Sequence, residues 1–207
     1  MGVLRSNASV RNLFIAENIS VMGDYFTYVA LVGLIKDATN STFLVSLVYA
    51  AYVLPSFFLS PIAGPIVDKF DRRKIIVFVS VLQALCGVGF LLSSADRIWL
   101  ALITQIVISS LAVITLPAFG SAIPNLTRND EELRQANVLF GSSWGASVFL
   151  GSALGGLFAA TFGRTATFAA DIGTFAICAL LVMLIKIPMQ ERKADAKREP
   201  VRPIADM

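Results

Sequence analysis

Three polar side chains lie at helical spacing inside the first long apolar stretch of the sequence. Glu17 and Asp24 are seven residues apart and Tyr28 follows four residues later, so all three share one helix face. A carboxylate at the centre of a bilayer costs at least about 2.5 kcal/mol, and such groups are usually functional. The chain has no His and no basic residue at that depth, so Asp24 could take up and release a proton. We interpret these residues as a candidate site for proton coupling or substrate binding.

A structural role is the alternative for the same residues. Asp24 could instead be hydrogen-bonded to neighbouring helices, with Glu17 near the cytoplasmic mouth. Gln83 and Gln105, in later apolar stretches, are further candidates for cavity or interhelical groups. Asp171 lies closer to the outer end of the last stretch, where a packing role or a helix-dipole contact is expected.

The composition is that of a membrane protein. Of the 207 residues, 56% are hydrophobic and 15% are charged, whereas soluble domains carry about 25% charged residues. A spanning helix needs about 20 mostly apolar residues, and six stretches meet this requirement. We predict an all-α integral membrane protein with six transmembrane helices, over Val10–Ile35, Thr42–Val67, Ile75–Ser94, Trp99–Phe119, Ala136–Phe162 and Thr165–Ile187.

Mostly short polar connections separate these stretches, so successive helices must be antiparallel neighbours. The longest connection is expected from Gly120 to Gln135. Residues 1–187 are predicted to form one six-helix bundle. Residues 188–207 are charged and carry three prolines, which indicates a cytoplasmic tail or a linker.

The basic residues set the orientation. Fourteen of the seventeen Lys and Arg residues fall on the side that holds both termini, and only Lys36, Arg97 and Arg164 fall on the other. Basic residues concentrate on the cytoplasmic side of membrane proteins. Both termini are therefore predicted to be cytoplasmic, in the plasma (inner) membrane.

The sequence offers no pattern for other chemistry. Cys86 and Cys178 lie within apolar runs and have no metal-ligand spacing, so we interpret them as small core residues. No nucleophile–base pair is evident. We predict no enzymatic activity, no metal or other cofactor, and no nucleic-acid partner.

The connection between the second and third helices carries a distinctive motif, G64-P-I-V-D68-K-F-D71-R72-R73-K74. Gly64 permits close helix approach, Asp68 could face a helix N-terminus or a basic partner, and Arg72 and Arg73 could bind carboxylates or helix C-termini. Such contacts would latch the cytoplasmic side shut. The alternative is a loop that only fixes topology.

This motif resembles the signature of the major facilitator superfamily, with Asp71 where many members carry Gly. That variant is similar to the enterobactin-exporter and macrolide-efflux branch. The resemblance continues along the chain in M22-G-D24-Y25, in the proline-rich approach L54-P-S-F-F-L-S-P-I-A-G64, and in E132-L-R-Q-A-N-V-L139. The fifth-helix segment G151-S-A-L-G-G156 resembles an antiporter motif, with Ser152 in place of the usual Pro.

Small residues form a stripe on the fifth helix. Gly141, Gly145, Gly155 and Gly156 fall within a sector of roughly 100°, together with Ser152 and Ala159. Such a stripe lets another helix approach closely. We interpret these glycines and Gly151 as helix-packing residues, on a surface that serves for packing, for rocking, or for both.

A weak internal repeat agrees with the family. Shifting the sequence by 91 residues pairs Gly64 with Gly155 and Arg73 with Arg164, which lie on opposite membrane sides. This matches an inverted 3+3 repeat, the arrangement of one half of a major facilitator fold.

The family resemblance implies a secondary transporter working by alternating access. Its branch implies proton-coupled efflux of small amphipathic organic molecules, such as drugs or siderophores. Members normally have two six-helix halves, so this chain is expected to be a fragment, a half that forms a homodimer, or one of two separately encoded halves. The alternative is a transporter-derived scaffold or accessory subunit without transport activity.

Overall fold

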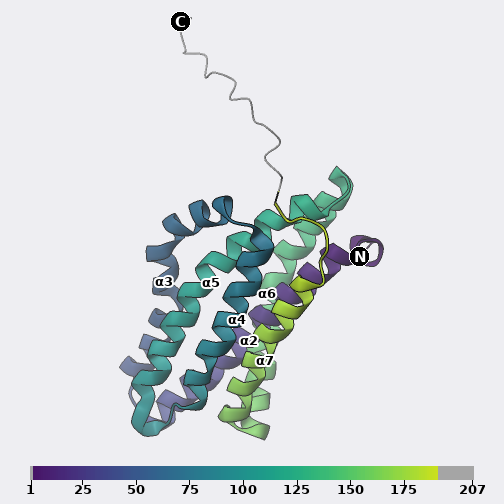
Figure 1. The fold of residues 1–207 in the computed structure, drawn as a ribbon. Helices are drawn as coiled ribbons and strands as arrows, with labels where there is room; N and C mark the ends of the chain where they lie inside the picture. The colour runs from purple at the N-terminus through teal and green to yellow at the C-terminus, as the bar shows by residue number, and fades with distance from the viewer. Residues whose placement is uncertain (1, 191–207) are drawn as a thin grey trace, which may run out of the picture.

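The computed structural model describes residues 2–190, which form a bundle of long helices without strands (Figure 1). Two short helical pieces accompany six long helices. The elements are α1 (Gly2–Ser6), α2 (Ala8–Thr39), α3 (Thr42–Lys69), α4 (Arg72–Leu91), the 3-10 turn η1 (Ala95–Arg97), α5 (Ile98–Leu126), α6 (Asp130–Phe162) and α7 (Arg164–Met183).

Side-chain caps fix where the helices begin. The Asn7 side chain accepts hydrogen bonds from the first backbone N–H groups of α2, and Ser41, Asp71 and Asn129 do the same for α3, α4 and α6. Asn40 ends α2 in the left-handed conformation, with φ of 50°. The single residue between α6 and α7 is Gly163, whose φ of 85° suits only glycine well.

All six long helices are long and apolar enough to cross a membrane. Large apolar side chains are exposed along their outer surfaces, including Phe57 and Phe58 on α3, Leu85 on α4 and Phe149 on α6. Such a surface suits hydrocarbon rather than water. The chain is therefore a multi-pass membrane protein, as the sequence predicts.

The packing of the helices has an internal symmetry. α2 packs mainly against α6 and α7, α5 packs mainly against α3 and α4, and α4 also packs against α7. Exchanging α2 with α5, α3 with α6 and α4 with α7 reproduces the same set of neighbours. α2 and α5 are an odd number of spans apart, so they run in opposite directions. The arrangement is thus the inverted 3+3 repeat of the predicted fold.

Arginine contacts at opposite ends of the bundle follow the same symmetry. Arg164, the first residue of α7, forms an ion pair with Asp37 near the end of α2. Arg72, the first residue of α4, donates from Nε to the Ser121 hydroxyl near the end of α5, at 2.9 Å. We call the end that carries residues 70–71 the signature-loop end and the opposite one the far end.

Two separate apolar cores occupy the two ends of the bundle. The core at the signature-loop end includes Leu13 of α2 and Ile76 of α4, and the core at the far end includes Leu31 of α2 and Phe90 of α4. Polar side chains lie at intermediate levels, among them Asp24, Gln83 and Ser109. The polar middle of the bundle is where a site must be sought.

Most helix boundaries differ from the predicted ones by a few residues, and the largest differences lie around the fourth connection. The expected connection from Gly120 to Gln135 is mostly helical, because α5 continues to Leu126 and the Asn129 cap starts α6 at Asp130. Polar residues here extend the helices past their apolar spans. At the other end of the chain, α7 stops at Met183 rather than near Ile187. The short helix α1 was not predicted.

The predicted tail begins with residues that pack on the bundle. Met189 is fully buried, and its carbonyl oxygen accepts hydrogen bonds from Arg72 and from Asn125. Residues 188–190 therefore do not stand free of the bundle. The rest of the predicted tail, residues 191–207, lies outside the described residues.

Candidate functional site

A cavity of about 210 Å³ opens at the middle of the bundle. It lies among α2, α3, α5 and α6. Its walls combine one carboxylate, two hydroxymethyl groups and two aromatic rings with aliphatic side chains. The lining residues are Val21, Asp24, Tyr52, Ser56, Ile108, Ser109, Ala112, Val113, Leu116 and Trp144.

Asp24 supplies the charge of this cavity, as expected from its mid-helix position. Among the described residues, no Lys or Arg lies at this depth, because all of them occupy helix ends or connections. The two ion pairs, Arg134 with Glu131 and Arg164 with Asp37, also lie at helix ends. The carboxylate therefore faces the cavity without a basic neighbour from the described part of the chain.

Glu17 is a second acid on the same helix, seven residues or about 10.5 Å closer to the signature-loop end. Its side chain is half-buried, and its Oε2 atom is buried without a hydrogen-bond partner among the described residues. An unpaired buried carboxylate oxygen is costly unless it carries a proton or meets a ligand. Glu17 is thus a second acid whose surroundings leave one carboxylate oxygen unsatisfied.

Asp171 lies deeper in the bundle than the sequence suggests. Its carboxylate accepts hydrogen bonds from Thr27 at 2.6 Å and from Thr174 at 3.2 Å, and only 2% of the residue is exposed. It packs against Gly23, where an added Cβ would collide with the Asp171 and Thr174 side chains. The packing role expected from the sequence is what the structure shows. Asp171 sits beside the residue that precedes Asp24.

Three tyrosine rings gather beside the cavity. The ring of Tyr52, from α3, lies 5.7 Å from that of Tyr25 and 5.8 Å from that of Tyr28, both from α2. Tyr25 and Tyr28 are 6.3 Å apart. Periodicity placed Tyr28 on the Asp24 face, but it gave no sign of Tyr25 or Tyr52, which join the site through the packing of α3.

Gln105 lies next to the cavity rather than in its lining. It is 4% exposed, and its Nε2 donates to the hydroxyl of Ser109, a lining residue, at 2.8 Å. Its Oε1 is buried without a partner among the described residues. Gln83 donates instead to the Ile108 carbonyl at 3.4 Å, which joins α4 to α5.

The signature loop contacts the segment after α7. Arg72 donates to the Met189 carbonyl at 3.1 Å, and Arg73 donates to the carbonyl of Met183, the last residue of α7. Gln190 donates to the Asp68 carbonyl at 3.3 Å. The two arginines therefore hold the C-terminal end of α7 and the chain that follows it.

Other residues of the loop have local roles or open surroundings. Asp71 caps α4, its carboxylate accepting from the Lys74 backbone N–H at 3.1 Å, which gives this acid a local structural role. An added Cβ at Gly64 would meet nothing within 4 Å, so no helix of the described chain approaches there. The Asp68 side chain is exposed.

Removing the Arg72 side chain is expected to uncover Met189. We expect a cysteine introduced at Met189 to be unreactive toward a polar thiol reagent, and Arg72→Ala to make it reactive, because Arg72 holds the Met189 carbonyl. The rate of labelling measures the change. Lys74→Ala is the matched control, since that side chain is exposed and forms no hydrogen bond with Met189. Equal rates of labelling for the Met189 cysteine alone, with Arg72→Ala and with Lys74→Ala would contradict a holding role for Arg72.

The predicted glycine stripe divides into two parts. An added Cβ would lie 2.9 Å from the Met22 backbone at Gly151 and 2.7 Å from the Phe26 Cα at Gly155. One at Gly156 would lie 3.6 Å from Val29 Cγ1. These glycines bring α6 against α2. Gly141 and Gly145 face open space in the described chain, so no neighbouring helix uses them there.

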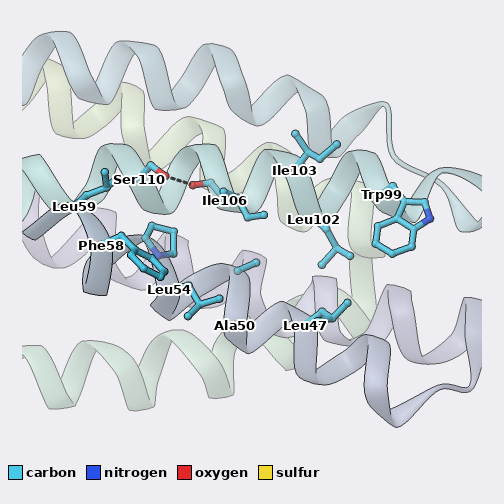
Figure 2. A pocket seen from close by; sticks show the side chains of 12 residues that line it. Leu47, Ala50, Leu54, Phe58, Leu59, Trp99, Leu102, Ile103, Ile106 and Ser110 are labelled. Carbon is cyan, nitrogen blue, oxygen red and sulfur yellow. Dashed lines mark hydrogen bonds between the residues drawn. The ribbon is translucent and has the colours of Figure 1, made fainter.

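A second hollow differs in chemistry from the central cavity. It is a groove of about 480 Å³ between α3 and α5, lined by side chains such as Leu54, Phe58 and Ile103. Figure 2 shows that its one hydroxyl, from Ser110, is bonded to the Ile106 carbonyl, at 2.6 Å. The groove offers no charged group, so the polar cavity is the better candidate site.

Comparisons with known proteins agree with this geometry. Over 198 residues the chain is 24% identical to the uncharacterized MFS-type transporter YfiS of Bacillus subtilis (strain 168), covering 95% of this chain and 47% of that one. It is 24% identical over 188 residues to the putative bacilysin exporter BacE of Bacillus amyloliquefaciens, and this match covers 90% of this chain and 47% of that protein. The chain thus spans about half the length of the curated relatives it matches.

A solved structure shares the fold. The crystal structure of the peptide transporter POT in complex with alafosfalin superposes with a TM-score of 0.73 at 12% identity, covering 86% of this chain and 38% of that one. The relatives and the fold are those of transporters rather than enzymes. The sequence model that describes the Major Facilitator Superfamily matches residues 13–206 of this chain. With that match, the six spans and the inverted repeat, the chain belongs to the Major Facilitator Superfamily.

Proposed function

We propose that this chain is one six-helix half of a secondary transporter that exports a small amphipathic organic molecule in exchange for protons. The observation that carries the proposal is the central cavity, with Asp24 in its wall and no basic side chain of the described residues at that depth. A protonatable group facing a cavity can bind a proton in one state and release it in another, which is what coupling requires.

Export is favoured by the relatives. Three of the proteins that the chain resembles carry the name of a putative bacilysin exporter, and the signature loop resembles an efflux branch of the family. Asp24 and Glu17 are proposed to carry the protons, and Tyr28 and Gln105 to take part in substrate binding beside them. The signature loop is proposed to hold one end of the bundle closed.

A second bundle is proposed to complete the cavity. The walls described here come from α2, α3, α5 and α6 of one bundle, and Asp24 lies in them. Leaving Asp24 open to hydrocarbon would be costly. The partner is either a C-terminal six-helix half or a second copy of this chain in a homodimer. Proton-driven uptake by a strictly monomeric six-helix preparation would contradict this requirement.

The orientation proposed from the basic residues can be tested by labelling. Single cysteines at Thr42 and Asp96, both exposed at the far end, are expected to react with an impermeant thiol reagent added outside cells. Cysteines at Lys69 and Asp130, exposed at the signature-loop end, are expected to react only after the cells are opened. This outcome would place the signature-loop end in the cytoplasm at the plasma (inner) membrane. The reverse pattern would contradict the orientation.

Transport itself is tested in inside-out membrane vesicles. An imposed proton gradient, acidic inside, is expected to drive uptake of a fluorescent amphipathic dye, and a protonophore is expected to abolish it. Vesicles from cells without the chain give the background. Uptake that survives the protonophore would contradict proton coupling. Uptake no greater than background for a broad dye panel, in vesicles where crosslinking shows the second bundle to be present, would favour the scaffold alternative.

A further inference from the structure

We infer that a groove at the signature-loop end of α4 and α7 binds an anionic phospholipid. The lipid phosphate pairs with Arg73 and Lys74, and an acyl chain lies along the apolar wall below them. The groove has a volume of about 510 Å³, and its lining residues are Asp71, Arg73, Lys74, Val77, Phe78, Val81 and Met183. This inference is separate from the proposed transport function and does not depend on the central cavity.

Two basic side chains from the first turn of α4 lie at the upper part of this groove. Arg73 donates to the Met183 carbonyl through one nitrogen, and its other N–H groups form no hydrogen bond with the described residues. Lys74 is exposed, and its ammonium group forms no hydrogen bond with them either. Neither side chain has an acidic partner among the described residues. Both are therefore available to phosphate oxygens, which suit a guanidinium particularly well.

The lining of the groove is net positive. Asp71 is the one acid among the lining residues, and its carboxylate accepts the Lys74 backbone N–H at 3.1 Å as the cap of α4. Two basic side chains against one acid leave a positive groove between two membrane helices. Such basic grooves recognise the headgroups of anionic lipids.

The wall below the basic pair is apolar. Phe78 and Val81 are exposed on α4, and Met183 is exposed at the end of α7. Leu85, also exposed, continues the same face of α4, since positions 78, 81 and 85 follow the helical period. At 1.5 Å per residue, this face extends about 16 Å from Lys74 to Leu85. One leaflet of a hydrocarbon core about 30 Å thick has nearly that depth, so the face matches one acyl chain.

The position of the groove leaves it to the bilayer. α4 and α7 lie side by side (Figure 1), and neither contributes to the walls of the central cavity, which come from α2, α3, α5 and α6. A second bundle that completed the cavity would meet those four helices. A lipid is therefore the occupant that fits a groove with a charged upper part and an apolar wall on the other two.

The inverted repeat offers a comparison within the chain. The 91-residue shift places Arg164 opposite Arg73, Thr165 opposite Lys74 and Ala169 opposite Phe78. Arg164 already forms an ion pair with Asp37. At the far end the corresponding positions thus hold one paired arginine, without a second cation or an aromatic ring. The basic groove is a property of these residues at one end and not a consequence of the shared fold.

Lipid selectivity of the purified chain tests the inference. Phosphatidylglycerol and phosphatidylcholine with identical acyl chains are offered in equal amounts to the protein in a neutral detergent. Native mass spectrometry then identifies the first lipid bound per chain. We expect phosphatidylglycerol to be preferred about five-fold, the effect of one unopposed basic side chain near a lipid phosphate. Equal binding of the two lipids would overturn the inference.

Two lysine variants locate the site. Lys74→Gln is expected to reduce the preference to about two-fold or less, and it leaves the contact of Arg73 with α7 in place. Lys69→Gln is the matched control, because it removes the same charge from an exposed position at the same end, outside the groove lining. An equal loss of preference in both variants would mean that the general charge of this end attracts the lipid, and it would overturn the site.

The apolar wall and the headgroup are tested separately. Phe78→Ala is expected to weaken binding of phosphatidylglycerol about three-fold, whereas Phe43→Ala, at an exposed position on α3, is expected to leave it unchanged. Glycerol 3-phosphate carries the charge without acyl chains, and at equal concentration it is expected not to displace the lipid. Displacement, or unchanged binding in Phe78→Ala, would assign the groove to free anions and overturn a lipid as its occupant.

Discussion

Vesicles that carry the Asp24→Asn variant are expected to lose proton-driven flux down to the background of vesicles without the chain. Asparagine has nearly the shape of aspartate, so it fills the same place in the cavity wall, but an amide cannot take up and release a proton at this position. The measurement is dye uptake under an imposed pH gradient, together with the amount of protein in the membrane. Loss of flux at an unchanged protein level would tie the defect to coupling.

A matched control for this variant is Asp96→Asn. Asp96 is exposed in η1, far from the cavity, and the same chemical change there is expected to leave flux unchanged. Normal proton-driven flux in Asp24→Asn would reduce Asp24 to a structural residue. The coupling role would then fall to Glu17 or Asp171, the two other acids near the polar middle.

Gly155→Ala is expected to destabilise the bundle, although alanine is the better helix former. The added methyl group would lie 2.7 Å from the Phe26 Cα, an atom of the α2 backbone that cannot turn aside. Forcing extra volume into a packed contact costs about 1 to 3 kcal/mol. We expect the purified protein in detergent to have a lower melting temperature. Intrinsic fluorescence recorded during heating measures it.

Gly145→Ala provides the opposite case on the same helix. A methyl group at Gly145 meets no atom of the described chain within 4 Å, and replacing glycine by alanine favours a helix by about 1 kcal/mol. The melting temperature is therefore expected to stay the same or rise. Equal losses of stability in both variants would mean that steric crowding against α2 is not the cause.

The sequence predicts the helices well because length and hydropathy are sufficient to define membrane spans. It fails at the ends, where the helices leave the bilayer. Polar residues such as Asn125 and Glu132 resemble a loop, yet α5 extends to Leu126 and the Asn129 cap begins α6. The bilayer no longer restricts composition there, so apolar length underestimates the helices.

From the sequence, only the site residues that share one face of one helix can be predicted to lie together. Glu17, Asp24 and Tyr28 share a face of α2, and periodicity alone brings them together. Tyr52 and Trp144 come from α3 and α6, and their place depends on how the helices pack. The depth of Asp171 depends on the contact of α7 with α2.

One local signal could have placed Asp171. Gly23 precedes Asp24, and a glycine inside a helix indicates a close neighbour. Asp171 and Thr174 form a polar pair at i and i+3 in the last helix, which is the kind of surface that would face such a glycine. The pairing of these two segments is a tertiary property, and neither segment specifies it by itself.

The separation of the apolar interior into two cores bears on how energetic effects combine. Leu13 belongs to one core and Leu31 to the other, on the same helix but about 27 Å apart along its axis. Sites this distant, with no shared contacts, make additive contributions to stability. Damage to one core would leave the other intact, so the helices could partly melt at one end while they stay joined at the opposite end.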